Sequence, residues 1–296
     1  MKYYNSRKST KDFDLKEIDF MLVNLNDVLR DAQKKHYAVG LFNTTDTDML
    51  EAAIAAAEEA RSPIIIGTAE VLLPFGELKL IAPSIIAAAK RASVPVVVHY
   101  DHGLTEERCM EAIELGFSSI MFDGSLGAPS ENLERTAKMV KYAHSRHISV
   151  EGEIGHVGEA STGDNETNDM YTTPGEAIDF VRTTGVDALA IAIGTAHGAY
   201  KTKPKLDIER LAEIRAAIDT PLVLHGGSGL SDDDFRNVIR YGIAKVNIFT
   251  DLCLAGVAAM RDGIEEAYLD IRNRKVEYIK RAVMRKMELF GSVGRA

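Results

Sequence analysis

Apolar runs short enough to be single strands recur along the whole chain. They are rich in Val, Ile and Ala. Such runs are typical of strands that are buried on both faces of a parallel sheet. Three of them begin at Pro63, Pro95 and Pro221, where the missing N–H breaks no interior ladder bond. The eight runs are residues 38–42, 63–66, 95–98, 119–122, 149–153, 188–193, 221–224 and 244–248.

Amphipathic stretches separate these runs, with apolar residues at three- and four-residue spacing. The clearest of them are residues 47–60, 106–115, 131–143, 208–218 and 232–241. Strand and helix therefore alternate, which predicts an α/β fold of the (β/α)8 TIM barrel class. An open doubly wound sheet is the alternative, because periodicity does not prove closure. Residues 251–289 continue as a long helical region and predict extra C-terminal helices that serve subunit contacts.

Composition excludes several classes of protein. The net charge of -9 argues against nucleic-acid binding, which needs a basic surface to replace phosphate counterions. Only Cys109 and Cys253 are present, without the spacing of a metal or redox motif, as expected in a reducing cytoplasm. The first residues lack the apolar segment of a signal peptide, and no later stretch reaches the ~18 consecutive apolar residues of a membrane span. We therefore expect a cytoplasmic protein that binds neither nucleic acid nor membrane.

Polar and ionisable residues gather where the predicted strands end. Enzymes on this barrel carry their active sites at that face. No strand beginning carries a comparable cluster. In strand order the residues are Asn43, then His99 to Gly103, Asp123, Glu151 and Glu153, Gly194 to Gly198, His225 to Gly229, and Asn247 to Thr250.

Three histidines follow three different strands and can converge at the barrel mouth. They are His102, His197 and His225. Three protein ligands and one open position suit a catalytic zinc ion. A single histidine beside a strand is more often structural, but the shared barrel position favours ligation for the set. His99 is an alternative to His102, although its place within the strand end favours a packed role behind the ligands.

Glycine-rich turns after the last two strands predict a phosphate site. Bare backbone N–H groups can approach phosphate oxygens there, which is the usual phosphate position of this barrel. The residues concerned are Gly226, Gly227 and Ser228, together with the segment from Asn247 to Thr250. Lys201 follows His197 by four residues and either adds positive charge to the bound anion or is a solvated lysine.

These motifs together resemble the class II ketose-bisphosphate aldolase family, especially its tagatose-bisphosphate aldolase branch. The likeness runs from about Leu22 to Ala296. Family proteins begin near Met21, so we expect residues 1–20 to be a flexible extension and residues 21–296 to be one barrel domain with its C-terminal helices. The motifs that carry the likeness are DHG at 101–103, AIGTAHGAYK at 192–201, LHGGS at 224–228 and KVNIFT at 245–250.

The resemblance implies a role for each group of residues. His102, His197 and His225 would bind one catalytic Zn²⁺, and Asp101 would be the acid/base. Asp123 and Glu153 match family carboxylates near an alternative metal position, with a structural salt bridge as the other interpretation. A monovalent cation near the phosphate is also implied. The residues expected to bind substrate or phosphate are Asn43, Gly198, Lys201, Gly226, Gly227, Ser228, Asn247, Ile248, Phe249 and Thr250.

Two positions depart from the family pattern. The loop after the fifth strand reads Gly158-Glu159-Ala160-Ser161, where many members have two glycines followed by acidic residues. Glu159 is the residue nearest that acidic position, and we expect it to remove the C3 proton, with Glu166 and Asp164 as alternatives. Phe249 stands where fructose-bisphosphate enzymes often carry an acidic residue that selects the rest of the sugar.

The predicted reaction is reversible aldol cleavage of a phosphorylated ketose to dihydroxyacetone phosphate and an aldehyde. Zinc would stabilise the enediolate as a Lewis acid, and Asp101 would take the proton of the C4 hydroxyl. A metal-dependent hydrolase or epimerase of a sugar phosphate is the first alternative, because one fold hosts many chemistries. A non-catalytic sugar-phosphate binding protein is the second. We expect a homodimer or homotetramer.

Overall fold

The structure is a computed structural model that describes residues 21–155, 157–159, 171–198 and 204–296. The predicted extension 1–20, Lys201, Asp164 and Glu166 lie outside the described residues. Glu159 is described only by its backbone. No described helix is both long enough and apolar enough to cross a membrane.

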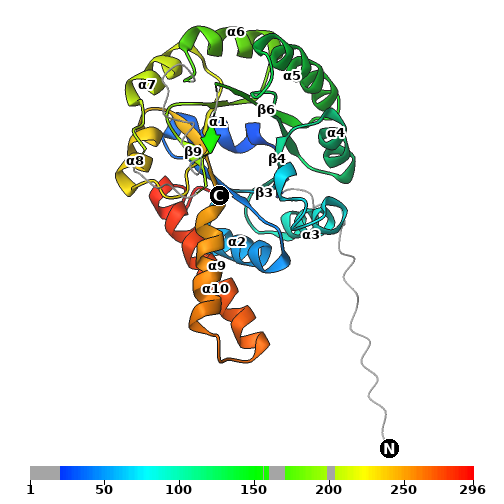
Figure 1. Cartoon of the computed structure of the whole chain (residues 1–296), viewed down its shortest axis with the longest axis vertical. Coiled ribbons are helices and arrows are strands. Elements are labelled where there is room, and N and C mark those ends of the chain that lie inside the picture. The colour runs from blue at the N-terminus through cyan, green and yellow to red at the C-terminus, as the bar shows by residue number, and fades with distance from the viewer. Residues whose placement is uncertain (1–20, 156, 160–170, 199–203) are drawn as a thin grey trace, which may run out of the picture.

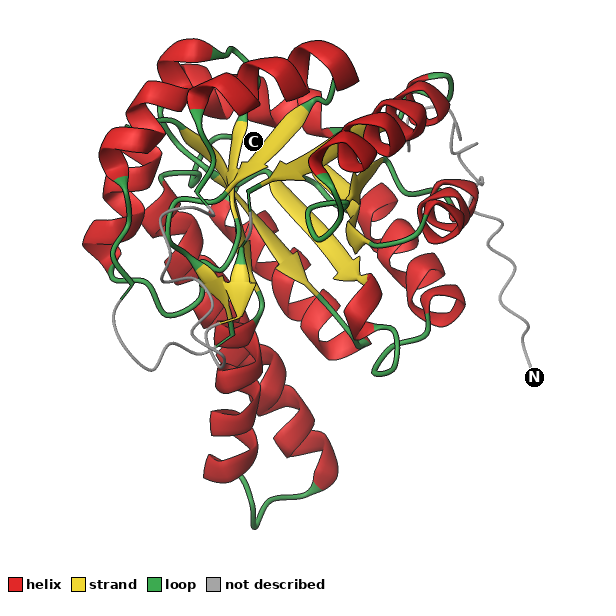
Figure 2. Cartoon of the chain, turned by 45° about the horizontal axis from the view of Figure 1, so that its top comes forward, coloured by secondary structure: helices red, strands yellow, loops and turns green. Residues whose placement is uncertain are grey.

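The predicted barrel is confirmed, and the doubly wound alternative is wrong. Eight parallel strands follow the order β11-β2-β3-β4-β5-β6-β8-β10, and the β4–β5 and β10–β11 pairings close the ring. Figure 2 shows the strands at the centre with helices around them. The strands are β2 (Val39–Asn43), β3 (Ile64–Ala69), β4 (Val96–Gly103), β5 (Ser119–Phe122), β6 (Ser149–Ile154), β8 (Ala188–Ile191), β10 (Leu222–Leu224) and β11 (Ile243–Ile248).

The outer ring consists of helices that follow the strands in sequence (Figure 1). Their apolar faces pack on the outward side chains of the strands and form the main hydrophobic core. All five predicted helices are present, with ends that move by at most a few residues. The ring is α2 (Thr47–Ala60), α3 (Leu78–Arg91), α4 (Glu106–Leu115), α5 (Pro129–His144), α6 (Pro174–Thr184), α7 (Ile208–Ala217) and α8 (Asp232–Arg240).

The amino-terminal end of the barrel is closed by a helix that the apolar pattern did not predict. This helix, α1 (Leu25–Lys35), follows the two-residue strand β1 (Leu22–Val23) and starts with a capping box between Asn24 and Asp27. Leu25 and Leu29 are fully buried against inward side chains of the barrel strands. Burying each leucine contributes about 1.5–3 kcal/mol, so α1 is held as part of the core.

The predicted C-terminal helices are also present. They form α9 (Thr250–Asp262) and α10 (Tyr268–Phe290), a pair that projects from the barrel (Figure 1). The second half of α10 returns to the barrel and buries Val283, Met287 and Phe290. Its first half is tied to α2 by ion pairs, among them Lys275 to Asp46 at 2.7 Å.

The interior of the barrel changes from apolar to polar along its axis. Side chains that point inward recur at every second strand position. In β4, for example, Val97 packs in the apolar cluster with α1, whereas His99 and Asp101 lie above it. In β10, Val223 belongs to the apolar cluster and His225 follows it. The amino-terminal half of the interior therefore stabilises the fold, and the carboxyl-terminal half holds ionisable groups.

Candidate active site

A cavity of about 330 Å³ opens at the carboxyl-terminal end of the barrel. It is lined by all but one of the predicted site residues whose side chains the structure describes. The exception is His225, which contacts the lining residue His102. The lining residues are Asn43, Asp101, His102, Asp123, Glu153, His197, Gly198, Gly226, Gly227, Ser228, Asn247, Ile248, Phe249 and Thr250. The strand-end pattern thus brought together residues from seven of the barrel strands at one place.

The three predicted histidines converge in this cavity. Their rings stand nearly perpendicular to one another, with centroids 4.5 to 5.8 Å apart. Nε2 of His102 lies 2.8 Å from Nδ1 of His225. One nitrogen of each of the three rings lies within 4.8 Å of the others. This arrangement can hold one divalent metal ion with a position left open toward the cavity.

A local distortion of β4 makes the first of these ligands available. We predicted that the strand ends before His99, but β4 continues to Gly103, because its backbone stays paired with β3 as far as Asp101. The pairing with β5 shifts register between Tyr100 and Gly103, and His102 takes a left-handed backbone with φ of 44°. Since two consecutive residues of a regular strand point to opposite faces, this irregularity is what lets both Asp101 and His102 reach the cavity.

Two of the three histidines contact a carboxylate through their second ring nitrogen. Nδ1 of His102 lies 2.7 Å from Asp123, and Nε2 of His225 lies 2.8 Å from Glu151. Metal-binding histidines usually donate their second N–H to a carboxylate, which fixes the tautomer and the ring orientation. His102 and His225 therefore have the kind of carboxylate contact that metal-binding histidines usually have.

Sequence reasoning assigned no role to Glu151 or Lys245. Both are fully buried, and Nζ of Lys245 lies 2.7 Å from Glu151. Burial opposes ionisation of Glu151, but Lys245 and His225 hold its pKa below the ordinary value. A lysine and a glutamate inside apolar strands are a sequence signal, because a buried charge is tolerated only when it is paired.

His99 is not part of the three-histidine group. Its Nδ1 lies 2.8 Å from the hydroxyl of Ser119, and the ring is fully buried. Burial and the charge of Lys245 lower its pKa to about 3, so the ring is neutral. The packed role predicted for His99 agrees with this position.

The histidines themselves differ in charge when no metal is considered. Burial and the neighbouring His102 lower the pKa of His197 to about 3 and also lower that of His225. Burial opposes protonation of His102 too, but Asp101 and Asp123 raise its pKa to about 10. One positive charge therefore already sits at the centre of the cluster, where the carboxylates favour a cation.

Asp101 is a buried carboxylate with two amide donors. Asn43 donates to it at 2.8 Å and Asn247 at 3.1 Å. Burial opposes its ionisation, but the charges of His102 and Lys245 hold the pKa of Asp101 well below its usual range. It is therefore ionised at neutral pH and can accept a proton from a group bound in the cavity.

Asp123 and Glu153 form a second candidate group with His102, also within 4.8 Å. The salt-bridge interpretation fits Asp123, which pairs with His102. Glu153 differs: its Oε2 is buried without a hydrogen-bond partner among the described residues, and burial together with Asp123 raises its pKa well above the ordinary value. An unpartnered buried oxygen that faces the cavity is a place for a cation or a substrate hydroxyl.

The turn after β10 has the backbone that an anion site needs. Gly226 has φ of 65°, and a Cβ at Gly227 would lie only 2.8 Å from Val246. Only glycine is accommodated at both positions without strain. The Ser228 hydroxyl accepts hydrogen bonds from the backbone N–H groups of Phe249 and Asp251, which ties this turn to the start of α9. The N-cap residue Phe249 supplies no side-chain cap to α9, and Ser228 takes that place at the N–H of Asp251, so the start of α9 lies beside the glycine turn.

His197 is supported by a small sheet that sequence analysis did not predict. It lies on β9 (Ala196–His197), which pairs with β7 (Gly158–Glu159) in a separate two-stranded sheet. In this register the backbone of Glu159 is opposite His197. The start of the loop that follows β6 is therefore fixed beside a candidate metal ligand.

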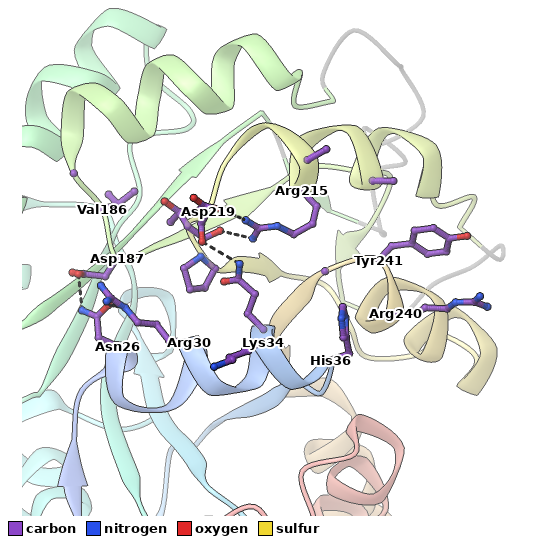
Figure 3. A pocket seen from close by; sticks show the side chains of 17 residues that line it. Asn26, Arg30, Lys34, His36, Val186, Asp187, Arg215, Asp219, Arg240 and Tyr241 are labelled. Atoms are coloured by element: carbon purple, nitrogen blue, oxygen red, sulfur yellow. Dashed lines mark hydrogen bonds and ion pairs between the residues drawn. The ribbon is translucent and has the colours of Figure 1, made fainter.

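A larger hollow, of about 920 Å³, lies at the opposite end of the barrel between α1 and the turns that precede β8, β10 and β11 (Figure 3). Its polar groups largely bond to one another. Asn26 donates to Asp187, Gln33 to the carbonyl of Asp219 and Arg215 to that of Thr220. It holds none of the histidine and carboxylate groups that could bind a metal.

Comparison with known proteins points to one family. Residues 23–295 match the family model of class II fructose-bisphosphate aldolase. The chain is 38% identical to 6-phospho-5-dehydro-2-deoxy-D-gluconate aldolase of Bacillus licheniformis, over 93% of this chain and 96% of that protein. It is also 38% identical to a fructose-bisphosphate aldolase of Thermus caldophilus, over 93% and 100%. The crystal structure of the YdjI aldolase from Escherichia coli K12 superimposes with a TM-score of 0.86 at 36% identity, covering 93% of this chain and all of that one.

Proposed function

Because the chain belongs to the class II fructose-bisphosphate aldolase family, we propose that it is a zinc-dependent aldolase that cleaves a phosphorylated ketose to dihydroxyacetone phosphate and an aldehyde. Aldolase activity and a phosphorylated sugar substrate follow from the named relatives. The observation that carries the metal-dependent mechanism is the convergence of three histidines, two of which contact a carboxylate through their second ring nitrogen. Family membership favours this reaction over hydrolysis, epimerisation or binding alone. Assignment to the tagatose-bisphosphate branch stays a prediction.

The residues of the cluster fit a zinc ion. His102, His197 and His225 would hold it, and neutral imidazole nitrogens are among its preferred ligands. When bound, the ion would supply Lewis-acid polarisation of the ketose carbonyl. Asp123 and Glu153 would offer the alternative position. The monovalent cation near the phosphate stays a prediction.

Asp101 would move the proton in the bond-breaking step. In cleavage it accepts the proton of the C4 hydroxyl while the C3–C4 bond breaks and the aldehyde carbonyl forms. In condensation it returns that proton to the aldehyde oxygen. Asn43 and Asn247 orient the carboxylate by donating to it, and its lowered pKa keeps it ionised before cleavage.

The turns after β10 and β11 would hold the phosphate. Backbone N–H groups of Gly226, Gly227 and Ser228 and the adjoining start of α9 would be the anion-binding elements. Gly198 lines the same cavity. Lys201, which follows it in sequence, would add positive charge.

The decisive experiment is condensation of dihydroxyacetone phosphate with a panel of aldehydes, in zinc-loaded protein and after removal of the metal by a chelator. We expect carbon–carbon bond formation only with metal. Asp101→Ala should retain zinc and phosphate affinity and lose kcat by about 10²–10⁴-fold, because general acid–base catalysis contributes that much. Absence of bond formation with every aldehyde would reject the aldolase proposal, and an equally active Asp101→Ala would reassign the acid/base.

Glu159 would remove the C3 proton of dihydroxyacetone phosphate. Support comes from the β7–β9 register, which puts its backbone opposite His197. The test is exchange of the C3 hydrogen with deuterated water in the absence of aldehyde, in Glu159→Gln and in Glu166→Gln as the matched variant of the same loop. We expect exchange to be lost only in Glu159→Gln. Loss only in Glu166→Gln would transfer the role to that residue.

We also propose a homodimer or homotetramer built through the projecting helices. Six large apolar side chains are exposed on α9, on the turn after it and on the start of α10, namely Leu254, Val257, Met260, Ile264, Tyr268 and Leu269. Exposed apolar side chains gathered on one element mark an interface. Sedimentation of Ile264→Asp should give a smaller species than the parent protein, and an unchanged one would exclude this surface. A cytoplasmic location stays a prediction.

A further inference from the structure

The closed barrel fixes which wall of the cavity lies across from the phosphate turns. Going round the ring, β4 stands opposite β10 and β5 stands opposite β11. A ketose whose phosphate is held after β10 and β11, with its reacting carbons at the histidines, must extend its remaining carbons toward β3, β4 and β5. The chemistry of that wall therefore selects the aldehyde half of the substrate.

That wall is aliphatic. Val71, Leu72, Leu104 and Leu126, which follow β3, β4 and β5, line the cavity there. Three of them are solvent-exposed to an unusual degree for large apolar residues: Val71 by 60%, Leu104 by 38% and Leu126 by 77%. Apolar side chains on a cavity rim are expected to contact a ligand.

No lysine or arginine is among the described residues that line this cavity. The carboxylate beside the wall is Glu70, which accepts a hydrogen bond from the backbone N–H of Leu104 at 2.8 Å.

The arginines on the helices that follow β4 and β5 are engaged elsewhere. Arg108 on α4 pairs with Glu111, and Arg135 on α5 lies over the outward ring of Phe122 and pairs with Glu106. A phosphate on the aldehyde half would lose its hydration against aliphatic side chains and approach Glu70, with no lysine or arginine among the described lining residues to offset its charge. Like charges brought together in this way are strongly disfavoured. An uncharged aldehyde has no such cost.

Resting on the proposed function, we infer that the aldehyde half of the substrate carries no phosphate, so that the ketose is a monophosphate rather than a bisphosphate. The wall formed by Val71, Leu72, Leu104 and Leu126 is the specificity-determining surface.

The test uses two aldehydes with one carbon skeleton, glyceraldehyde and glyceraldehyde 3-phosphate, each condensed with dihydroxyacetone phosphate by the zinc-loaded protein. We expect kcat/KM to be at least about tenfold higher for glyceraldehyde. The reason is that bringing like charges together costs more than the ~1.4 kcal/mol that corresponds to a tenfold difference. A ratio of one or less overturns the inference. Exchange of the C3 hydrogen without aldehyde is measured in parallel. If exchange occurs and the phosphorylated aldehyde is preferred, the inference is rejected but the proposed function stands. If neither exchange nor condensation occurs, the proposed function is rejected.

A charge-insertion pair locates the selecting wall. Leu126→Arg places a cation on the exposed rim, and Tyr241→Arg places the same charge on an exposed position at the opposite end of the barrel. We expect Leu126→Arg to shift the kcat/KM ratio toward glyceraldehyde 3-phosphate by about tenfold, the effect of one favourable charge contact. Tyr241→Arg should leave the ratio unchanged. An unchanged ratio in both variants, with zinc content retained, overturns the assignment of this wall to the aldehyde.

Discussion

The two ends of the barrel both carry hollows, and the larger one is at the end without the candidate catalytic groups. At the amino-terminal end, about 920 Å³ is lined by polar side chains that mostly bond to each other or to nearby carbonyls (Figure 3). At the carboxyl-terminal end, only about 330 Å³ is available, but Asn43, Glu153 and Asn247 each keep a buried oxygen without a partner among the described residues. Unsatisfied buried polar atoms therefore locate the chemistry better than the size of the hollow does.

The difference between the ends has a cause in the packing of the interior. α1 covers the amino-terminal opening, so inward side chains there must be apolar to pack against Leu25 and Leu29. No described helix covers the other opening in this way, and inward positions there can carry histidines and carboxylates that meet solvent and substrate. The barrel is thus stabilised at one end and reactive at the other.

Removing a histidine at the reactive end should have the largest effect. We expect His102→Ala, His197→Ala and His225→Ala each to lose the bound metal and to lower kcat/KM by about three orders of magnitude or more, because a metal Lewis acid supplies several kcal/mol. Metal content by elemental analysis and activity after zinc or cobalt addition are the measurements. The matched variant is His36→Ala in the amino-terminal hollow, which should keep both. Full activity in metal-free protein would end the zinc hypothesis.

Loss of the carboxylate behind His225 should have an intermediate effect. Glu151→Gln keeps the shape but weakens the hold on Nε2, and we expect metal affinity to fall by about 10–100-fold. The matched control is Asp187→Asn at the other end of the barrel, where Asp187 also lies 2.8 Å from a histidine, His144, but near the surface. Metal affinity is measured by competition with a chromophoric chelator, and it should not change in Asp187→Asn. Equal affinity of Glu151→Gln and the parent protein would show that the carboxylate does not orient the ligand.

A methyl group in the phosphate turn should have the smallest of these effects. A Cβ at Gly227 would lie 2.8 Å from Val246 and 3.0 Å from the carbonyl of Asn247. Overpacking costs about 1–3 kcal/mol, and the lower part of that range corresponds to roughly tenfold weaker binding of dihydroxyacetone phosphate in Gly227→Ala. Metal affinity should not change. Gly175→Ala is the control, because nothing lies within 4 Å of a Cβ there. If metal and phosphate affinity fall equally in Gly227→Ala, the cause is misfolding of the turn.

Much of the barrel and of the site could be predicted from order along the chain. Runs that are apolar at every position predict strands that are buried on both faces of a sheet. Because these runs alternate with amphipathic helices, the strands are predicted to be parallel. The carboxyl ends of such strands must meet at one face, so residues as far apart in sequence as His102 and His225 could be grouped before any geometry was known. The start of α1 could also have been predicted from the sequence, because its capping box depends only on the four residues from Asn24 to Asp27.

Only the tertiary structure decided how the grouped side chains meet. The register shift that turns Asp101 and His102 to the same cavity depends on the pairing of β4 with both of its neighbours. The contact of Lys245 with Glu151, and of Glu151 with His225, joins three strands across the closed ring. The aliphatic wall faces the phosphate turns because β4 and β5 stand opposite β10 and β11. A strand's own residues set which face each side chain takes, but what lies across the barrel depends on closure and register, which are properties of the whole sheet.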